Sequence, residues 1–261
     1  MKIALGQLDI EWENKDVNMK KCEKFIKEAA SKGCDIVIFP EMTFTGFSMN
    51  TSTIGEDLDG FTVSNFKKIA KQNSIAICFG YVKNSHNKYF NEMIIVDKNG
   101  VIVSNYDKIH PFSHGAESKY YEGGSKITTC NIDGINIGSF ICYDLRFPEV
   151  FLESSKTNEL IIVIANWPED RIESFNVLLR ARAIENQCFI VAVNRVGFSN
   201  GLNYNGCSQV INPLGKVLTH ICNNQKLIIC DISKEEVTNL RKTFPVKGDR
   251  RKEIYRDFYL Y

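Results

Sequence analysis

The segment SFICYDLRFPE, residues 139–149, is the part of the sequence that best indicates the fold. An apolar run ends there at Cys142, and a polar segment that can begin a helix follows at once. A strand that stops beside a helix N-terminus carries its last side chain to the edge of a sheet. Free N–H groups at that edge favour a thiolate and can bind an oxyanion. Cys142 is therefore the first candidate nucleophile.

Two other segments have the same form. Residues 36–41, IVIFPE, are an apolar strand that ends in the carboxylate Glu41, and residues 106–108 close a predicted hairpin with Lys108. A free thiol has a pKa of about 8.5, so it needs a neighbouring base or cation to react at neutral pH. Glu41 can accept the thiol proton and Lys108 can stabilise an oxyanion. The three residues form a candidate catalytic group.

Short apolar runs alternate with amphipathic segments along much of the chain. A run such as 160–165, LIIVIA, predicts a strand buried on both faces. Asp16 is placed to begin a helix as its cap, and Gly33 is placed to end it. The strands predicted in this way are 2–9, 35–39, 75–82, 160–165 and 189–194, and the helices are 16–32, 61–72, 148–154 and 174–186.

Hairpins interrupt this alternation in the middle and near the end of the chain. Residues 98–100, Lys-Asn-Gly, carry an Asn-Gly turn signal between strands 90–96 and 101–106. Further turns are predicted at 133–134 and 212–215, and Ser233 with Glu236 forms a capping box for the last helix. Apolar strands flanked by helices in both halves predict an α/β protein with mixed sheets, plausibly two similar sheets packed face to face.

Composition and charge narrow the class of protein. A chain of 261 residues with 44% hydrophobic and 24% charged residues suits one globular domain, residues 1–261, with a C-terminal tail from about residue 245. The net charge of +1 leaves no basic excess for nucleic acid. We find no signal-peptide pattern and no apolar run near the roughly 18 residues of a membrane span, so we expect no membrane partner. Nine cysteines without a Cys-x-x-Cys pair predict reduced thiols and a cytoplasmic location.

The candidate catalytic segments also carry a family resemblance. FPE at 39–41, DK at 107–108 and CYDLRFPE at 142–149 resemble the three signature regions of the nitrilase, or carbon–nitrogen hydrolase, superfamily. The resemblance continues through ANWP at 165–168, RARAIEN at 180–186, NRVG at 194–197 and NPLG at 212–215. It implies a four-layer αββα sandwich with two mixed sheets, a homodimer, and amide hydrolysis without a cofactor or metal.

Within this superfamily, the chain looks most similar to the bacterial ω-amidases, through WP at 167–168 and FTGF at 44–47. The ω-amidases hydrolyse the terminal amide of 2-oxoglutaramate and 2-oxosuccinamate to the acid and ammonia, through a thioester. By resemblance, Glu117 matches a second glutamate that orients Lys108 or the substrate amide. The backbone N–H of Tyr143 would join Lys108 at the oxyanion.

The substrate-binding residues are less constrained by the sequence. Trp167 can be a core aromatic or a wall of the pocket, and its place just past a strand end favours the pocket. Arg171 and Arg195 are candidates for binding a substrate carboxylate, with surface salt bridges as the alternative. Arg146 and Glu149 are expected to form ion pairs near the site.

Several alternatives remain open. Another superfamily substrate, such as a carbamoyl amino acid or deaminated glutathione, would use the same chemistry, and a non-enzymatic binding protein on the same fold is a third option. A papain-like pair of Cys142 with His110 is a rival arrangement. His110 and His114 lie four residues apart, but Pro111 and Gly115 break any helix that would align them on a metal.

Two features bear on specificity and assembly. The ω-amidase resemblance predicts an acidic and a basic residue where this chain has Cys207 and Gln209, which leaves the substrate range open and makes Cys207 a structural residue. Residues 255–261, YRDFYLY, form an apolar tail that must pack on its own domain or on a partner. The family resemblance favours a homodimer in which the tail crosses the interface.

Overall fold

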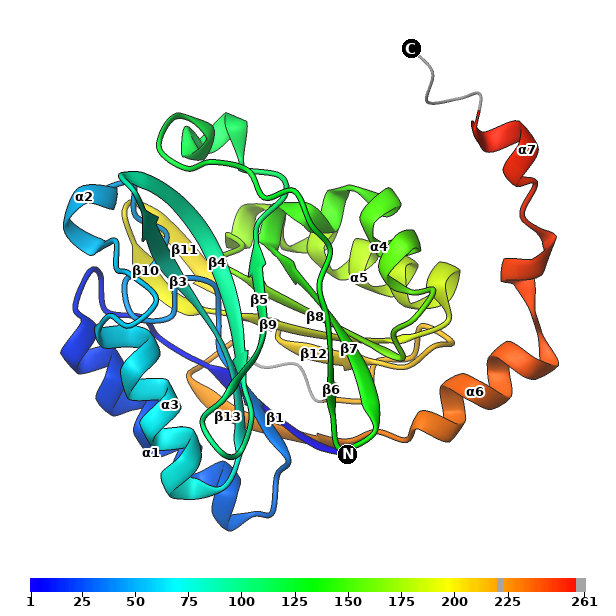
Figure 1. Cartoon of the computed structure of the whole chain (residues 1–261), viewed down its shortest axis with the longest axis horizontal. Helices are drawn as coiled ribbons and strands as arrows, with labels where there is room; N and C mark the ends of the chain where they lie inside the picture. The colour runs from blue at the N-terminus through cyan, green and yellow to red at the C-terminus, as the bar shows by residue number, and fades with distance from the viewer. Residues whose placement is uncertain (220–222, 257–261) are drawn as a thin grey trace.

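The computed structural model describes residues 1–219 and 223–256, and two mixed β-sheets packed face to face form its centre (Figure 1). The six-stranded sheet has the order β13-β1-β2-β3-β4-β5. Its strands are β1 (Lys2–Gln7), β2 (Ile36–Ile38), β3 (Ala76–Ser85), β4 (Lys88–Val96), β5 (Ile102–Asp107) and β13 (Lys226–Asp231). The five-stranded sheet has the order β12-β9-β8-β7-β6. Its strands are β6 (Thr129–Ile132), β7 (Ile135–Ile141), β8 (Leu160–Ala165), β9 (Phe189–Asn194) and β12 (Gln209–Ile211).

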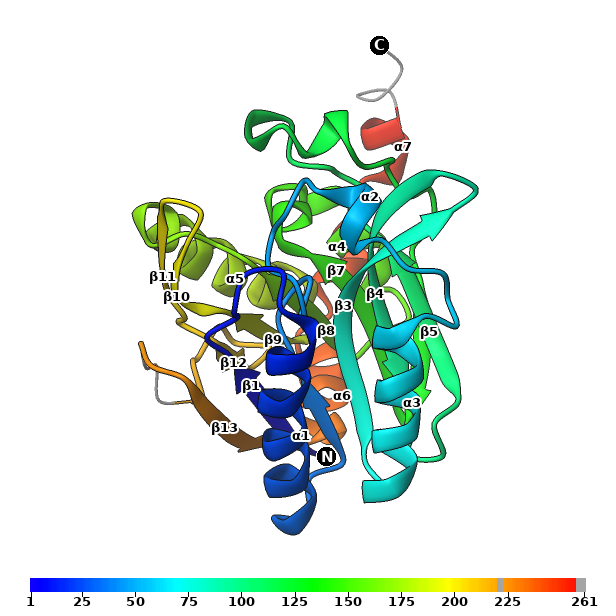
Figure 2. The same cartoon turned by 90° about the vertical axis from the view of Figure 1, so that its left-hand side faces the viewer.

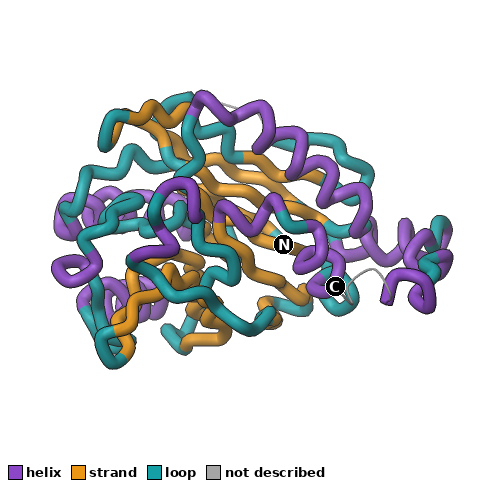
Figure 3. The backbone as a smooth tube through the Cα atoms, turned by 90° about the horizontal axis from the view of Figure 1, so that it is seen from above, coloured by secondary structure: helices purple, strands orange, loops and turns teal. Residues whose placement is uncertain are grey.

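Helices cover the outer faces of the two sheets. The pair α1 (Lys15–Ser31) and α3 (Phe61–Asn73) packs on the six-stranded sheet. The pair α4 (Pro148–Ser154) and α5 (Ile172–Asn186) packs on the five-stranded sheet. Figures 2 and 3 show the strands lying between these helical layers. The predicted αββα sandwich with two mixed sheets is confirmed.

Alternation along β2 shows how the sequence produces two cores. Ile36 and Ile38 lie in the cluster between the two sheets, whereas Val37 packs with the helices on the outer side. All three side chains are fully buried. A strand that buries both faces has no polar positions, which is why this run of the sequence is continuously apolar.

Some local predictions were wrong. The cap of α1 is Asn14, whose side chain accepts the N–H of Val17, and not Asp16. The capping box at Ser233 does not form, because the Ser233 hydroxyl bonds to Glu235 while Glu236 reaches Asn212. The helix that follows, α6 (Lys234–Thr243), is also not the last, since the short α7 (Lys252–Tyr255) comes after it.

A hairpin between residues 196 and 205 was missed altogether. Its strands β10 (Val196–Ser199) and β11 (Leu202–Asn205) form a separate two-stranded sheet. Asn200 and Gly201 make the turn, both with positive φ, of 49° and 78°. Such an Asn-Gly turn between two short runs is a strong hairpin signal. The shortness of its strands, four residues each, concealed it.

The C-terminal segment leaves the body of the sandwich. After α6, the 3₁₀ turn η5 (Val246–Asp249) and α7 run outward from the sheets (Figure 1). Residues 257–261 of the predicted apolar tail lie outside the described residues. Within the described residues, no helix combines the length and apolarity that crossing a membrane requires. The division into a single domain stays a prediction.

The strands carry the candidate residues to one end of the sandwich. Glu41 follows β2, Lys108 follows β5 and Cys142 follows β7. Gly80, in β3, lets the segment after β2 lie close against it. A Cβ atom added at Gly80 would lie 2.6 Å from the backbone nitrogen of Met42 and 3.0 Å from the Cα of Glu41. This glycine is therefore required for the position of Glu41.

We expect Gly80→Ala to destabilise the protein by about 1–3 kcal/mol, because the new methyl group overlaps backbone atoms that cannot move away cheaply. Urea unfolding of the variant and the parent protein measures the difference. Gly248→Ala is the matched control, since nothing lies within 4 Å of its added Cβ. Equal midpoints for Gly80→Ala and Gly248→Ala would show that the backbone segment at Glu41 adjusts freely.

Candidate active site

Cys142 occupies a tight turn between β7 and the 3₁₀ turn η3 (Cys142–Arg146). Its φ is +46°, in the left-handed region that a non-glycine residue seldom adopts. The buried carboxylate of Asp144 holds this turn in place. It accepts hydrogen bonds from the backbone N–H of Ile141 (3.1 Å), the hydroxyl of Tyr106 (2.8 Å) and the backbone N–H of His110 (3.0 Å). Strained backbone persists where its surroundings fix it in this way, often at functional sites.

The three charged residues expected beside Cys142 lie together in the interior. Lys108 Nζ donates to Glu41 Oε1 at 3.0 Å and to the two carboxylate oxygens of Glu117 at 3.1 and 2.8 Å. Glu41 and Glu117 are 0% exposed and Lys108 is 1% exposed. Glu117 lies in the 3₁₀ turn η2 (Glu117–Lys119), where Phe112 N–H also donates to its carboxylate at 2.6 Å. Buried charges need partners of this kind to be tolerated.

Two asparagines complete this cluster, and sequence reasoning gave neither a role. Asn166 follows β8 and donates its backbone N–H to Glu41 Oε2 at 2.8 Å and its side-chain amide to the Glu41 carbonyl at 2.7 Å. Asn91, in β4, donates its amide to Glu41 and to Glu117. A signal for Asn91 was available. It lies two and four residues before Met93 and Ile95, which face the core between the sheets, so it too must face inward.

Burial and charge set the protonation state of the group. Burial raises the pKa of the Cys142 thiol well above its usual value, Glu41 raises it further, and Lys108 offsets only part of this. Burial alone would lower the pKa of Lys108, but Glu117 and then Glu41 raise it well above the ordinary range. Burial also raises the pKa of Glu117. This direction runs against the expectation that the turn after Cys142 favours a thiolate, since burial has the larger effect on the thiol.

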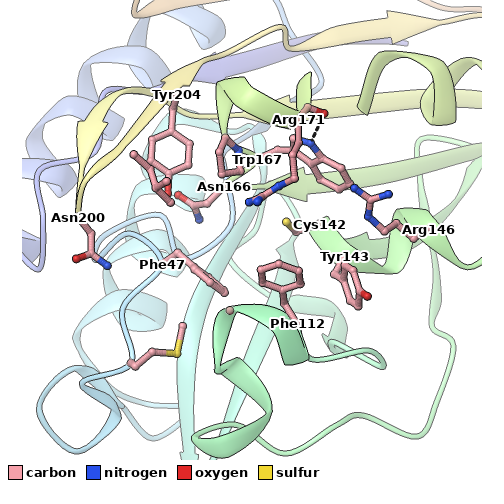
Figure 4. Close-up of a pocket in the computed structure, with 14 residues that line it drawn as sticks. Phe47, Phe112, Cys142, Tyr143, Arg146, Asn166, Trp167, Arg171, Asn200 and Tyr204 are labelled. Atoms are coloured by element: carbon pink, nitrogen blue, oxygen red, sulfur yellow. Dashed lines mark hydrogen bonds between the residues drawn. The ribbon is translucent and has the colours of Figure 1, made fainter. Parts of the chain in front are cut away.

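Cys142 opens onto a pocket with a volume of about 170 Å³ (Figure 4). Tyr143, Arg146 and Asn166 line the pocket around the thiol. Glu41, Lys108 and Glu117 are not part of its lining and lie behind the wall. The remaining walls come from separate segments: Phe47 and Met49 from the loop after β2, Phe112 and Gly115 from the loop after β5, Trp167, Pro168 and Arg171 from the segment after β8, and Asn200, Leu202 and Tyr204 from the β10–β11 hairpin.

Comparison with known proteins identifies the family. Residues 2–242 match the carbon–nitrogen hydrolase family. The chain belongs to the carbon–nitrogen hydrolase family. It is 35% identical to a 2-oxoglutaramate amidase of Bacillus subtilis (strain 168) over 97% of this chain and 98% of that protein. It is 30% identical to a deaminated glutathione amidase of Dictyostelium discoideum over 98% of this chain and 95% of that protein. It is therefore a hydrolase of carbon–nitrogen bonds other than peptide bonds, and an amidase.

A solved structure of the family gives the same fold. The chain resembles a CN-hydrolase superfamily protein from Xanthomonas campestris with a TM-score of 0.91 and 32% identity, over 96% of this chain and 97% of that one. That protein carries an arsenic adduct in its active site.

One of the two arginines proposed to bind a substrate carboxylate lies outside the pocket. Arg171 lines the pocket as predicted, whereas Arg195 is fully buried, donates to the Ile10 carbonyl at 2.8 Å and lies under the Tyr204 ring at 4.6 Å. Arg195 is thus a structural residue. Arg146 takes its place as the second pocket cation, above the ring of Trp167 at 5.0 Å.

Trp167 serves both of its predicted roles. It is 3% exposed and belongs to the core, yet it also lines the pocket. Its indole Nε1 donates to the carbonyl of Arg171 at 2.8 Å, which ties the pocket wall to the residue that carries the guanidinium (Figure 4).

The prediction that Arg146 and Glu149 form ion pairs near the site was wrong, because in the described residues neither has one within 4.0 Å. Arg146 instead donates to the Ser174 hydroxyl at 3.3 Å and lies over Trp167.

The histidine arrangements are not supported by the geometry. The His110 ring lies 2.8 Å from Asp144 Oδ1 and stacks on Phe147 at 3.8 Å, so it is held by residues other than Cys142. His114 packs at the edge of the Phe112 ring. No cluster of three metal-ligating side chains occurs in the part of the chain that the structure describes. Cys207 has a positive φ of 60°, and Gln209 bonds to Asn176 at 2.8 Å, which fits structural roles for both.

We expect Lys108→Ala to lower kcat by about 10²–10³-fold, because it removes a buried positive charge whose field acts on Cys142. It also leaves Glu41 and Glu117 without their shared ion-pair partner. Steady-state ammonia release measures the loss. Lys83→Ala is the control, since Lys83 also pairs with two carboxylates, Glu92 and Asp107, but away from the pocket. Full activity in Lys108→Ala would make the lysine a purely structural residue.

The raised pKa of Cys142 predicts the pH dependence of its alkylation. Only the thiolate reacts, and a pKa above the usual value keeps its fraction small at neutral pH. The rate of iodoacetamide labelling at Cys142 should therefore still be rising beyond about pH 9, the range of an ordinary thiol. Peptide mapping across a pH series measures that rate. A plateau below neutral pH would mean that the resting protein stabilises the thiolate.

Proposed function

We propose that the protein is a cysteine-dependent ω-amidase, which hydrolyses the terminal amide of a short acid of the 2-oxoglutaramate or 2-oxosuccinamate type. One observation carries this proposal. The guanidinium groups of Arg146 and Arg171 line the same pocket as Cys142, and the described lining contains no Asp or Glu. A cationic pocket of this kind favours a substrate with a carboxylate and disfavours one with an ammonium group. The similarity to a 2-oxoglutaramate amidase agrees with it.

The first half of the reaction makes a thioester. The Cys142 thiol gives its proton to Glu41 while Sγ bonds to the amide carbon, and the carbonyl π electrons move onto oxygen. Lys108 and the backbone N–H of Tyr143 stabilise the resulting oxyanion. When the tetrahedral intermediate collapses, the C–N bond breaks and the proton on Glu41 passes to the leaving nitrogen. Ammonia departs, and the acyl group stays on sulfur.

The second half uses water and the same base. Glu41 takes a proton from a water molecule as its oxygen attacks the thioester carbon. Collapse of this second intermediate breaks the C–S bond, and the proton on Glu41 returns to the thiolate. The acid leaves, and the thiol and carboxylate are restored. The raised pKa of Cys142 fits this scheme, because the thiol keeps its proton until Glu41 removes it at the moment of attack.

Arg171 is the residue that we assign to the substrate carboxylate, with Arg146 beside it. The Arg171 guanidinium lies over the Phe112 ring at 5.6 Å, and its ion pair with Asp170 is long, at 3.8 Å, and exposed. An exposed pair of this length is weak, so the guanidinium is available to a ligand. The reduced cysteines of the core, such as Cys22, Cys78 and Cys188, fit a cytoplasmic enzyme.

A deaminated glutathione amidase is the second candidate. The similarity to the Dictyostelium amidase of that name favours it, and two arginines could bind the two carboxylates of a longer substrate. A carbamoyl amino acid is distinguished by its products, because its hydrolysis releases carbon dioxide together with ammonia. A non-enzymatic role is disfavoured by the intact group of Glu41, Lys108 and Cys142.

An ammonia-release assay over a substrate panel tests the proposal. The panel contains 2-oxoglutaramate, 2-oxosuccinamate, glutamine, asparagine, a carbamoyl amino acid and deaminated glutathione. We expect the 2-oxo amides to give the highest kcat/KM, Cys142→Ala to be inactive, and Glu41→Gln to lose about 10²–10⁴-fold in kcat. Preference for glutamine would contradict the cationic pocket, and activity in Cys142→Ala would contradict the thioester.

The chain is also proposed to form a homodimer. The side chains of Ile184, Leu214 and Phe244 are 52%, 66% and 63% exposed and line one shallow groove beside α5 and α6. Exposed apolar groups gathered in this way are typical of an interface. The tail at 255–261, which the sequence predicts to pack on its own domain or on a partner, would supply further apolar side chains to such an interface.

We expect light scattering to give the mass of a dimer for the full chain. A chain that ends before Tyr255 should dimerise more weakly, because it lacks the apolar tail. A monomeric full-length protein would refute the dimer. A truncated protein that dimerises as tightly as the full chain would refute the role of the tail alone.

A further inference from the structure

The two buried glutamates share the same pair of donors. Asn91 Nδ2 lies 2.7 Å from Glu41 Oε1 and 2.8 Å from Glu117 Oε1. Lys108 Nζ lies 3.0 Å from the same oxygen of Glu41 and 3.1 Å from the same oxygen of Glu117. The four groups therefore form a closed ring in which each Oε1 accepts one hydrogen bond from the asparagine and one from the lysine.

This ring distinguishes the two oxygens of Glu41. Oε1 accepts from Asn91 and Lys108, whereas Oε2 accepts from Asn166, through its backbone N–H at 2.8 Å and its side-chain amide at 3.4 Å. The same N–H of Asn166 also interacts with the sulfur of Cys142 and lowers its pKa. Oε2 and the thiol are thus neighbours of one donor. Oε2, the oxygen that shares this donor with the thiol, is the one outside the ring.

The orientation of the Asn91 amide is fixed by charge. Turning the amide over would point its carbonyl oxygen at two carboxylates, and that arrangement is repulsive. In the orientation observed, both N–H groups have partners, while Oδ1 is buried without one in the described structure. A buried carbonyl with no partner costs stability. Asn91 is therefore satisfied only at the end that contacts the glutamates.

We infer that Asn91 is a positioning residue for the amidase reaction, which holds Oε1 of Glu41 so that Oε2 receives the proton of Cys142. The inference rests on the proposed roles of Cys142 and Glu41. Asn91 does not line the pocket, so it acts on the base and not on the substrate. Its neutral amide adds a donor to the cluster without adding a second positive charge beside Glu41.

Replacement by aspartate tests this role. The titratable groups around Asn91 are Glu41, Lys108, Glu117 and Cys142, with Tyr121 beyond them. A third carboxylate among them disfavours the ionised form of the carboxylates already there. We expect Asn91→Asp to move the acidic limb of the kcat profile to higher pH by about one unit or more and to lower kcat, with KM nearly unchanged.

Asn91→Leu, which is neutral and has the same number and branching of side-chain heavy atoms, separates charge from positioning. It should lose about 10–100-fold in kcat, the equivalent of one hydrogen bond to a charged group, without the shift in pH profile. Asn105→Asp is the matched control. Asn105 lies on the adjacent strand β5 and donates its amide to another buried carboxylate, Glu92, at 3.3 Å, but away from the cluster. Its kcat and pH profile should match those of the parent protein.

The outcomes decide between the two proposals. If Cys142→Ala keeps its activity, the proposed function is wrong whatever Asn91 does. If Cys142→Ala is inactive while Asn91→Leu and Asn91→Asp keep kcat within twofold, only the inference about Asn91 is wrong. A fall in kcat with a matching fall in the unfolding midpoint and no shift in pH profile for Asn91→Asp would make the residue structural. A shift in the Asn105→Asp profile would also overturn the inference, since any added carboxylate would then have the same effect.

Discussion

The ion-paired group of Lys108 between Glu41 and Glu117 is the constraint on which the site depends. Each of these three charged side chains has almost no exposure and loses its hydration in the interior. None of them is tolerated there without a partner of opposite charge. They must therefore meet, although Glu41 follows β2 while Lys108 and Glu117 come from two places in the segment after β5. The meeting fixes the loop after β2, the end of β5 and the turn at η2 relative to one another. The thiol, held by a separate set of contacts around Asp144, is then presented to a base whose place is already determined.

The sandwich supplies the rigid frame for this arrangement. Parallel pairing of β2 with β3 and of β7 with β8 brings the ends of these strands to the same side of the molecule. Loops alone would leave the positions of the candidate residues variable. Strands that are buried on both faces fix these positions. Gly80 approaches the backbone at Glu41 so closely that an added Cβ atom would overlap it, so small shifts of these segments are not accommodated. The pocket walls, by contrast, come from loops and from one hairpin, which are the elements best suited to vary with the substrate.

Much of this was accessible from the sequence, for identifiable reasons. Apolar runs that end in Glu41, Lys108 or Cys142 carry a strong local signal, and a buried strand has one way to present its last residue. Asn91 was missed because a single polar residue in a strand reads as a solvent-facing position until the alternation with Met93 and Ile95 is followed. Arg195, just after β9, and Arg146, at the end of η3, were misassigned because the direction of a long side chain at such a position depends on tertiary packing. No local pattern reports that.

The placement of two guanidinium groups at the pocket has a consequence for how a substrate arrives. Arg146 is exposed, and Arg171 is partly so, while the base, the lysine and the second glutamate are enclosed behind the wall. An approaching anion therefore meets positive charge first and the buried negative charge only at contact distance. Fixed charges around a concave site accelerate capture, and dissolved salt weakens them. The encounter rate with an anionic amide should thus fall as ionic strength rises, while the bond-breaking steps, shielded from solvent, continue at the same speed.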